Sequence, residues 1–418
     1  MWKIASTLLF FSSVVAHAQI KPEEISPRAA AIKRGDFVAA AKLPARDDEE
    51  ARFLEASVLL ARHRIAEAEA IYEGLPRGTH TEAELAWLLA HARRDPQRSA
   101  AAAKALCARG DPTGRACVDE EFYAARVVRG AVQRHGPTKL RMAQGAPFPL
   151  VLGRVGQRHT GVIVDTGASQ TVVSTRLAKE LGLALSRRSF PIGVVAGSGV
   201  ASAHLAILPE LWLDKTQLTT VPVLVLDVPG LEENGIDIIL APHRDLQGLV
   251  VELDFPSHQL TLLEENAAAR PNGLVLPYLH AGFDLVVEAR VGEGPMALFS
   301  FDTGMDQGFA VSEDYASGLQ QVRSSSQSAG AVLYGAQQSR ELRKTPPLIV
   351  QLGSASMPPQ EGLITPLLDG RVFRMSGMLG NALWRERVVV LDTVRHRISI
   401  HENTPLKSTP GEAAPQPR

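Results

Sequence analysis

The tripeptide Asp-Thr-Gly occurs twice in this chain, at positions 165–167 and 302–304, each time directly after an apolar run. The two copies are separated by an offset of 137 (302 − 165), and other landmarks recur in the same order at offsets between 135 and 139. These landmark pairs are 148 with 283, 154–156 with 290–292, 238–241 with 377–380, and 250–254 with 388–392. Offsets that drift by single positions are typical of small loop insertions, so the repeat predicts two copies of one folding unit.

The repeated unit is predicted to be β-rich. From Gly145 onward the chain consists of short Val-, Leu- and Ile-rich runs separated by Gly, Pro and Asp, a pattern typical of strands joined by turns. Clear examples lie at 150–152, 161–164, 221–226 and 249–253. We predict the two units at 146–268 and 274–402. The tail at 403–418, with its Pro and Gly, cannot bury a core and is expected to be disordered.

The segment before the repeat, 19–137, is predicted to be helical. Ala, Leu, Glu and Arg dominate from about Ile25 to Val132, and apolar residues recur every three or four positions. Breaks are expected at 74–76, 95–96 and 110–112, where Gly and Pro lie. Residues 66–72 loosely match the second helix of a tetratricopeptide-like hairpin. The array is either a docking surface or shield for a protein partner, or a spacer that packs on the β-rich part.

The segment 1–18 has the layout of a secretory signal peptide, with a basic start, a short apolar run and Ala16-His17-Ala18 at the end. The alternatives are an uncleaved anchor or a buried helix. Cleavage would leave a protein without stable membrane insertion, located in the periplasm or secreted. The net charge of −1 offers no global attraction for nucleic acid.

The two cysteines, Cys107 and Cys117, are ten positions apart (117 − 107). An oxidising compartment favours a local disulfide between them, and the alternative is a pair of free thiols. Two thiols without a matching His pair make a poor metal site, and we expect no metal.

The duplicated pattern resembles the retropepsin-like aspartic proteases over about residues 146–402. Shared features are two apolar residues before Asp-Thr-Gly, a glycine-rich hairpin, and an apolar-Leu-Gly (or Leu-Ala) segment before a short helix. The resemblance implies two retropepsin-like acid-protease β-barrel lobes fused in one chain, as in pepsins. One chain would then supply a complete active site for a polypeptide substrate, with no cofactor.

The resemblance also implies roles for individual residues. Asp165 and Asp302 would form a dyad that shares one proton, because two like charges about 3 Å apart cannot both ionise; the dyad of this family is the standard example of such a pair. The surrounding loops are expected to support it through Thr166, Gly167, Ser169, Thr303 and Gly304. The glycines allow tight turns, and the threonine hydroxyls would bond across the lobe interface.

Glycine-rich segments in both halves occupy the position of the family's flap, a mobile hairpin that covers the substrate. The flap candidates are Gly197, Ser198, Gly199, Gly330, Tyr334 and Gly335. The alternative is that these segments are plain surface hairpins.

Two departures from the family pattern bear on catalysis. Asp306 either places a further charge near the dyad or points into solvent, and Met305 precedes it where the first loop has Ala168. Ala241 stands where the second half has Gly380, and its cost depends on the sign of φ. The competing interpretation is therefore a catalytically silent peptide-binding or scaffolding protein that keeps the protease fold.

Overall fold

The computed structural model describes residues 11–12, 27–33, 40, 42–43, 49–111, 114–124, 130–194, 199–227, 230–265, 273–323, 327–329, 342–365, 368–369 and 373–402. The predicted signal peptide lies outside these residues except for strand β1 (Phe11–Ser12), which pairs with β7 (Phe190–Val194). The predicted tail at 403–418 lies outside them too. In the described part of the chain, no helix is both long enough and apolar enough to cross a membrane.

The region before the repeat is helical, as predicted. Its helices are α1 (Pro27–Lys33), α3 (Glu49–Ala61), α4 (Ile65–Glu73), α5 (His80–Arg93), α6 (Pro96–Ala108) and α7 (Arg115–Ala124). The three predicted breaks coincide with interhelical loops. Thr79 caps α5 by accepting a hydrogen bond from Glu82 N, and Asp95 caps α6, whose first residue is Pro96. From α3 to α7, consecutive helices pack on one another, but the tetratricopeptide assignment stays a prediction.

The C-terminal boundary of the helical region was predicted wrongly. Residues 131–134 form strand β2 (Ala131–Arg134), which pairs antiparallel with β9 (Thr216–Leu226). Their side chains alternate between exposed and half-buried, and β2 completes the edge of the sheet next to β9. The first lobe therefore begins before residue 146.

Two β-rich lobes follow, and the predicted strands at 150–152, 161–164, 221–226 and 249–253 are confirmed. Lobe 1 also contains β3 (Thr138–Arg141), β4 (Leu150–Val155), β5 (Arg158–Val164), β6 (Val172–Ser174), α8 (Thr175–Glu180), β8 (Gly199–Leu213), η2 (Glu232–Asn234), β10 (Ile236–Leu240), α9 (Pro242–Asp245), β11 (Leu249–Asp254) and β12 (Gln259–Glu264). Its main sheet has the order β1-β7-β8-β4-β5-β10-β6-β9-β2.

Lobe 2 repeats this plan with shorter strands. It comprises β13 (Leu274–Pro277), β14 (Leu279–Ala281), β15 (Asp284–Val291), β16 (Ala297–Phe301), β17 (Phe309–Ser312), α10 (Glu313–Ser317), α11 (Gln320–Arg323), β18 (Gln327–Ala329), β19 (Leu342–Lys344), β20 (Val350–Leu352), β21 (Ala355–Ser356), β22 (Leu363–Thr365), β23 (Leu368–Asp369), β24 (Arg374–Met375), β25 (Gly377–Leu379), η3 (Asn381–Leu383), β26 (Arg387–Asp392) and β27 (Arg397–Glu402). The main sheet runs β18-β19-β22-β17-β25-β16-β15-β20-β21.

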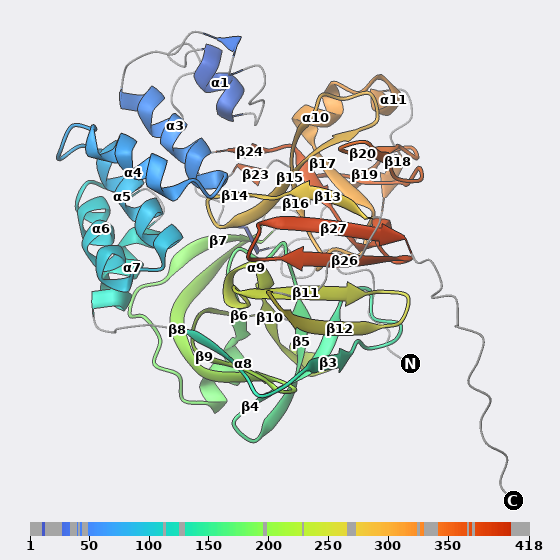
Figure 1. Ribbon diagram of the computed structural model, residues 1–418, viewed down its shortest axis with the longest axis horizontal. Helices are drawn as coiled ribbons and strands as arrows, with labels where there is room; N and C mark the ends of the chain where they lie inside the picture. The colour runs from blue at the N-terminus through green and yellow to red at the C-terminus, as the bar shows by residue number, and fades with distance from the viewer. Residues whose placement is uncertain are drawn as a thin grey trace, which may run out of the picture.

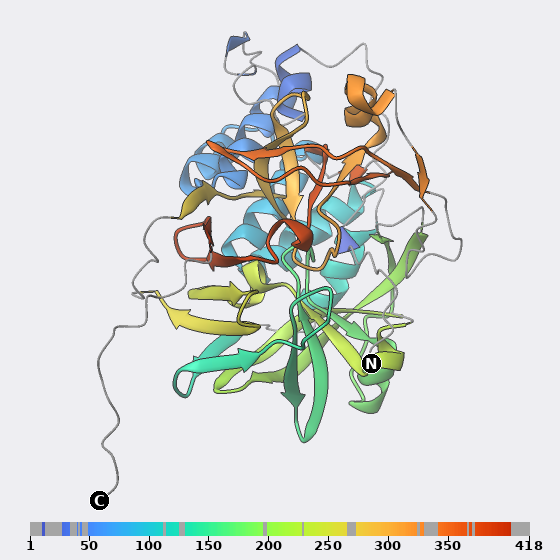
Figure 2. The same ribbon diagram turned by 90° about the vertical axis from the view of Figure 1, so that its right-hand side faces the viewer.

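A six-stranded sheet of order β13-β27-β26-β11-β12-β3 joins the lobes, and Figure 1 shows it between them. Figure 2, turned by 90°, again shows the orange strands of lobe 2 above the green strands of lobe 1. At the centre of this sheet Glu252 pairs with Val390, its own counterpart in the repeat at an offset of 138 (390 − 252). Equivalent strands of the repeat thus pair with each other about an approximate two-fold axis.

The helical region packs on both lobes (Figure 1). Buried Leu54 and Trp87 share a hydrophobic cluster with residues of lobe 2 that include Met305 and Met378. On the other side, Val118 and Phe122 of α7 share a cluster with lobe 1. Packing on the β-rich part is therefore observed, while a role in docking a partner stays a prediction.

Cys107 and Cys117 form a disulfide that joins α6 to α7. Because it closes a loop of about ten residues, its removal should release about 2–3 kcal/mol of chain entropy in the unfolded region. We expect the Cys107→Ser/Cys117→Ser variant to melt at a lower temperature, followed by circular dichroism at 222 nm. Reduction of the wild-type protein should produce the same shift, and an unchanged midpoint in both would contradict this role.

Candidate active site

The two Asp-Thr-Gly turns occupy equivalent positions in the two lobes. Asp165 follows β5, and its N–H donates to Leu240 O at 2.9 Å; Asp302 follows β16, and its N–H donates to Leu379 O at 2.9 Å. In each lobe the strand that supplies this carbonyl, β10 or β25, pairs parallel with the strand before the aspartate and antiparallel with the strand after the loop. The same local topology therefore positions both carboxylates.

The two carboxylates face each other across the lobe interface. Gly304 N donates to Asp302 Oδ1 at 2.7 Å and to Asp165 Oδ1 at 3.1 Å, so a single N–H serves both side chains. Gly167 N donates to Asp165 Oδ1 at 2.8 Å, and Met305 N donates to Asp302 Oδ1 at 2.8 Å. Each inner oxygen is thus held by backbone N–H groups.

Both glycines are required by this close approach. A Cβ on Gly167 would lie 2.1 Å from Asp302 Oδ2, and a Cβ on Gly304 would lie 2.5 Å from Asp165 Cγ. No side chain larger than hydrogen fits at these distances. Glycine in each turn therefore makes room for the carboxylate of the other lobe.

The two threonines connect the turns through reciprocal hydrogen bonds. Thr166 Oγ1 donates to Phe301 O at 2.6 Å, and Thr303 Oγ1 donates to Val164 O at 2.7 Å. Each hydroxyl also accepts the N–H of the other threonine, at 3.0 and 3.1 Å. These buried bonds fix the turns relative to each other.

The free energy of this bonding can be tested by removing one hydroxyl. The Thr303→Val variant leaves the buried Val164 carbonyl and Thr166 N–H without partners, so we expect a loss of about 2–4 kcal/mol in the free energy of unfolding. Denaturant titration measures this loss. Thr303→Ser should recover most of the stability, and Thr219→Val, which removes a 3.4 Å bond at the surface, should cost little. Equal losses in the two valine variants would contradict the proposed bonding.

Burial dominates the electrostatics of the pair. Both carboxyl groups are fully buried (0% exposed), and burial raises the pKa of Asp165 to about 6. Burial and the neighbouring Asp165 charge raise the pKa of Asp302 well above its usual range. The outer oxygens, Asp165 Oδ2 and Asp302 Oδ2, are buried and accept no hydrogen bond from the described residues. They are therefore free to share one proton and to contact a water or substrate.

Asp306 does not point into solvent, so that interpretation of it is wrong. The side chain is buried, with 6% of its surface exposed, and it accepts a hydrogen bond from Gln307 Nε2 at 3.0 Å. Arg385 donates to its carbonyl at 3.1 Å. Apart from burial, the strongest influences on the pKa values of the dyad come from the two aspartates themselves and backbone N–H groups of the turns. Asp306 is thus not solvated, and an effect of its charge on the dyad stays a prediction.

Ala241 causes no strain, because its φ is −88°. Its N–H donates to Thr171 Oγ1 at 2.9 Å. In lobe 2 the corresponding loop approaches more closely: a Cβ on Gly380 would lie 2.4 Å from Gln307 O. Glycine is therefore needed at position 380 but not at position 241.

Of the remaining predicted site residues, the structure describes Ser169 and Gly199. Ser169 is buried in the first loop, where its carbonyl accepts a hydrogen bond from Arg244 Nη1 at 3.0 Å. The lobe 1 hairpin is present as β7 and β8, and Gly199 begins β8. The pairing of β18 with β19 forms the base of the corresponding segment in lobe 2. The other flap candidates lie outside the described residues: Gly197, Ser198, Gly330, Tyr334 and Gly335.

Sequence reasoning missed Asn381. Its side-chain amide donates to Thr303 O and, at 3.2 Å, to Pro147 O, and its backbone N–H donates to Met305 O at 2.7 Å. It therefore connects the Asp302 loop to the start of lobe 1. An Asn directly after the Leu-Gly landmark was the available signal. No group of three or more potential ligands suited to a metal ion is found among the described residues.

Two β-lobes thus bring paired Asp-Thr-Gly turns face to face around two buried carboxylates, an arrangement in which the two groups can share one proton. In a comparison with known protein families, residues 151–241, within lobe 1, match a family model described as aspartyl protease. No curated protein sequence matches the chain. Among solved structures, it is similar to the aspartic proteinase from Irpex lacteus, with a TM-score of 0.44 and 11% identity over 66% of this chain and 99% of that one.

Proposed function

We propose that the protein is an aspartic endopeptidase. The observation that carries this proposal is the pair of buried carboxylates whose inner oxygens are fixed by N–H groups and whose outer oxygens accept no hydrogen bond from the described residues. A protein that only binds peptides does not require two buried carboxylates that face each other. Ala241, one of the departures on which the silent alternative depended, causes no backbone strain, and Met305 donates its N–H to Asp302.

The geometry suggests how the pair performs hydrolysis. The ionised carboxylate removes a proton from a water, whose oxygen attacks the scissile carbonyl carbon, while the protonated carboxyl donates to the carbonyl oxygen. The tetrahedral gem-diol then collapses: the C–N bond breaks, the amine leaves with the proton held by the dyad, and one gem-diol hydroxyl gives its proton to the other carboxylate. One proton remains shared between Asp165 and Asp302, so the site is restored. No metal or covalent intermediate enters this scheme.

The pH dependence of this activity follows from the raised pKa values. Hydrolysis needs one ionised carboxylate, and burial places the pKa of Asp165 at about 6 while that of Asp302 is higher. Below pH 6 both groups become protonated, so kcat/KM should fall about tenfold per pH unit, and the optimum should lie near neutrality. A kcat/KM profile from pH 3 to 9 checks this. Full activity at pH 3.5 would contradict the proposed pKa values.

Export and partner choice are further parts of the proposal. The N-terminal sequence favours secretion to the periplasm or the medium, and the Cys107–Cys117 disulfide supports an oxidising compartment. The substrate would be a polypeptide bound as an added strand beneath the β7–β8 hairpin. One chain supplies both carboxylates, so the active site would be complete in a monomer.

A peptide-cleavage assay tests the function. The protein without residues 1–18 is incubated with a mixed peptide library at several pH values, and mass spectrometry identifies new termini. We expect internal cleavage that is unaffected by a strong metal chelator or by a serine-directed acylating reagent. Binding of library peptides without any new terminus would favour the silent alternative.

A further inference from the structure

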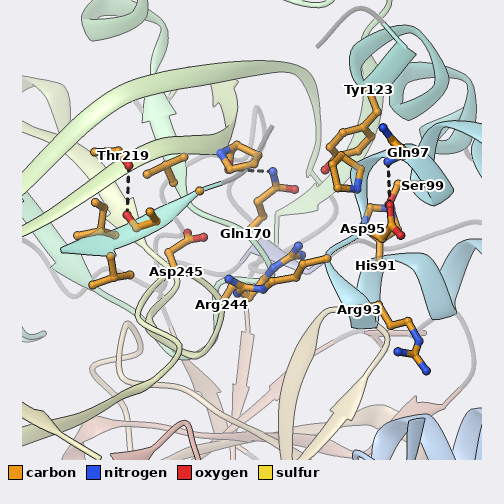
Figure 3. A pocket seen from close by; sticks show the side chains of 18 residues that line it. His91, Arg93, Asp95, Gln97, Ser99, Tyr123, Gln170, Thr219, Arg244 and Asp245 are labelled. Atoms are coloured by element: carbon orange, nitrogen blue, oxygen red, sulfur yellow. Dashed lines mark hydrogen bonds between the residues drawn. The ribbon is translucent and has the colours of Figure 1, made fainter. Parts of the chain in front are cut away.

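A cavity of about 500 Å³ lies between the helical region and lobe 1, away from the dyad. The end of α5 and the start of α6 form one wall, β2 and β9 form another, and α9 contributes Arg244 and Asp245 (Figure 3). A smaller cavity of about 280 Å³ shares His91, Arg94 and Arg244 with it. Volumes of this order are typical of small-ligand sites.

Arg94 brings a second guanidinium group into this space. It lies in the left-handed conformation (φ 52°) that ends α5, and it lines both cavities. Within the described chain, it makes no ion pair and its guanidinium makes no hydrogen bond, whereas its neighbour Arg93 pairs with Glu69. Burial lowers the pKa of Arg94 only to about 10, so it stays charged at neutral pH. Arg94 is exposed to solvent in this cavity, so its guanidinium is accessible to a ligand, and the Asp245 carboxylate acts to raise its pKa.

The other arginine of the cavity, Arg244, is positioned by the protease lobes. Its Nη1 donates to Ser169 O at 3.0 Å, and its guanidinium lies over the Phe283 ring at 4.8 Å from the centroid. Figure 3 shows it between Asp245 and the helix that carries His91, whereas Arg93 points away. Ser169 lies in the loop after Asp165. A ligand that binds Arg244 would therefore contact a residue that is hydrogen-bonded to this loop.

The remaining charges leave the cavity with an excess of one positive charge. Asp95 is engaged as the cap of α6, with its Oδ1 accepting from two backbone N–H groups at 3.0 Å. His91 is bonded to Asp119 at 3.1 Å, and Asp119 is paired with Arg115 at 2.8 Å. Asp245 then remains as the single acid facing two guanidinium groups among the described lining residues.

Asp245 does not compensate for both arginines. Its Oδ2 accepts a hydrogen bond from Thr171 Oγ1 at 2.5 Å, and burial raises its pKa. It lies within ion-pair distance of neither Arg94 nor Arg244 among the contacts of the described residues. Two guanidinium groups with free donors thus share one cavity.

We propose that this cavity binds a carboxylate-bearing ligand held by Arg94 and Arg244. A planar guanidinium donates two parallel hydrogen bonds to a carboxylate, which an ammonium group cannot do. Leu218, Val221 and Pro222 offer an apolar wall for the body of the ligand. The carboxylate could belong to the C-terminus of a short peptide or to a small organic acid, and the chemistry at the arginines is the same.

Isothermal titration calorimetry of the full protein tests this site. The probes are an N-acetylated tripeptide with a free C-terminal carboxylate, the same tripeptide as its amide, succinate, and inorganic phosphate. We expect at least one carboxylate probe to bind tenfold or more tightly than the amide. Binding of the tripeptide acid alone would identify a peptide source, and binding of succinate would identify a small acid.

Matched variants locate the binding. Arg94→Gln should weaken the carboxylate probe at least tenfold, whereas Arg93→Gln should leave its affinity within about twofold, with both variants melting near the wild-type temperature. The proposal is overturned if neither carboxylate binds, if the amide binds equally well, if phosphate alone binds, or if Arg94→Gln behaves as wild type. The comparison of Arg94→Gln with Arg93→Gln, together with succinate as a probe that has no peptide bond, separates this site from binding or cleavage at the dyad.

Discussion

Replacement of Asp302 by Asn should lower the rate of peptide cleavage by about 10³-fold or more while the protein stays folded. Asparagine keeps an oxygen that can accept the N–H groups of Gly304 and Met305, but it can neither hold nor deliver the shared proton. Asp165→Asn should have an equally large effect, because the two carboxylates act as one unit. Initial rates on a fluorogenic peptide, with circular dichroism to verify folding, measure both.

Asp306→Asn provides a matched control, since Asp306 is a buried acid in the same loop whose carboxylate accepts a hydrogen bond from Gln307. We expect its activity to remain within about threefold of wild type. If all three substitutions lower the rate equally, the loss reflects damage to the loop, and the assignment of Asp165 and Asp302 as the catalytic pair fails.

Lowering the pH should weaken the packing of the helical region on the lobes, because four histidines cluster between them. His63 comes from the turn after α3, His243 from α9, His280 from β14 and His396 from the turn after β26. The rings of His63 and His396 are stacked, with centroids 3.5 Å apart and 5° between their planes. His280 lies 4.6 Å from His63 and 5.5 Å from His243 between ring centroids. The cluster thus joins the helical region to both lobes.

The surroundings of the cluster oppose protonation. Burial lowers the pKa of His63 to about 4 and of His243 to about 3, and it lowers that of His280 well below its usual range. The positive charge of Arg244 acts in the same direction on His243 and His280. Burial lowers the pKa of His396 as well, although the Asp392 carboxylate opposes this shift.

The sign of the effect on stability follows from these shifts. Below pH 6.5 these histidines become protonated when they are exposed in the separated or unfolded state, but they stay neutral in the packed state. The free energy of unfolding therefore decreases as the pH falls. Each histidine contributes up to about 1.4 kcal/mol per pH unit between its ordinary and its lowered pKa. The dyad acts oppositely: its raised pKa values make the folded state gain stability between about pH 6 and 4. Burial also raises the pKa of Asp284 to about 7, which acts in the same direction as the dyad, so the histidine contribution is isolated by substituting single histidines.

Hydrogen exchange at pH 7 and pH 4.5 measures this effect directly. We expect α3, α4 and β14 to lose protection first as the pH falls. His280→Gln should reduce the pH dependence of the melting temperature, and His159→Gln, at an exposed position of β5, should not. Uniform protection at both pH values, or an unchanged slope in His280→Gln, would contradict the role of the cluster.

The sequence was sufficient to predict those features that a short motif or an internal repeat encodes. The Asp-Thr-Gly turns carry the carboxylate, the hydroxyl and the glycine together, and their duplication at a nearly constant offset indicated two lobes. The dyad could therefore be placed at Asp165 and Asp302 from the sequence alone.

Features set by long-range pairing were missed. The pairing of β11 with β26 joins segments that lie far apart in the sequence, and no local pattern encodes its register. The histidine cluster likewise combines single residues at four distant positions. The effect of Ala241 depended on a φ angle, and the position of Asp306 depended on its contacts with Gln307 and Arg385, neither of which the residue types reveal.

A crystal structure with a peptide analogue that carries a secondary hydroxyl in place of the scissile carbonyl tests the central claim most directly. We predict that the hydroxyl oxygen lies about 2.6–3.2 Å from both Asp165 Oδ2 and Asp302 Oδ2, in the place of the attacking water. A hydroxyl that contacts only one of these oxygens, or an analogue bound away from both turns, would contradict the catalytic role of the pair.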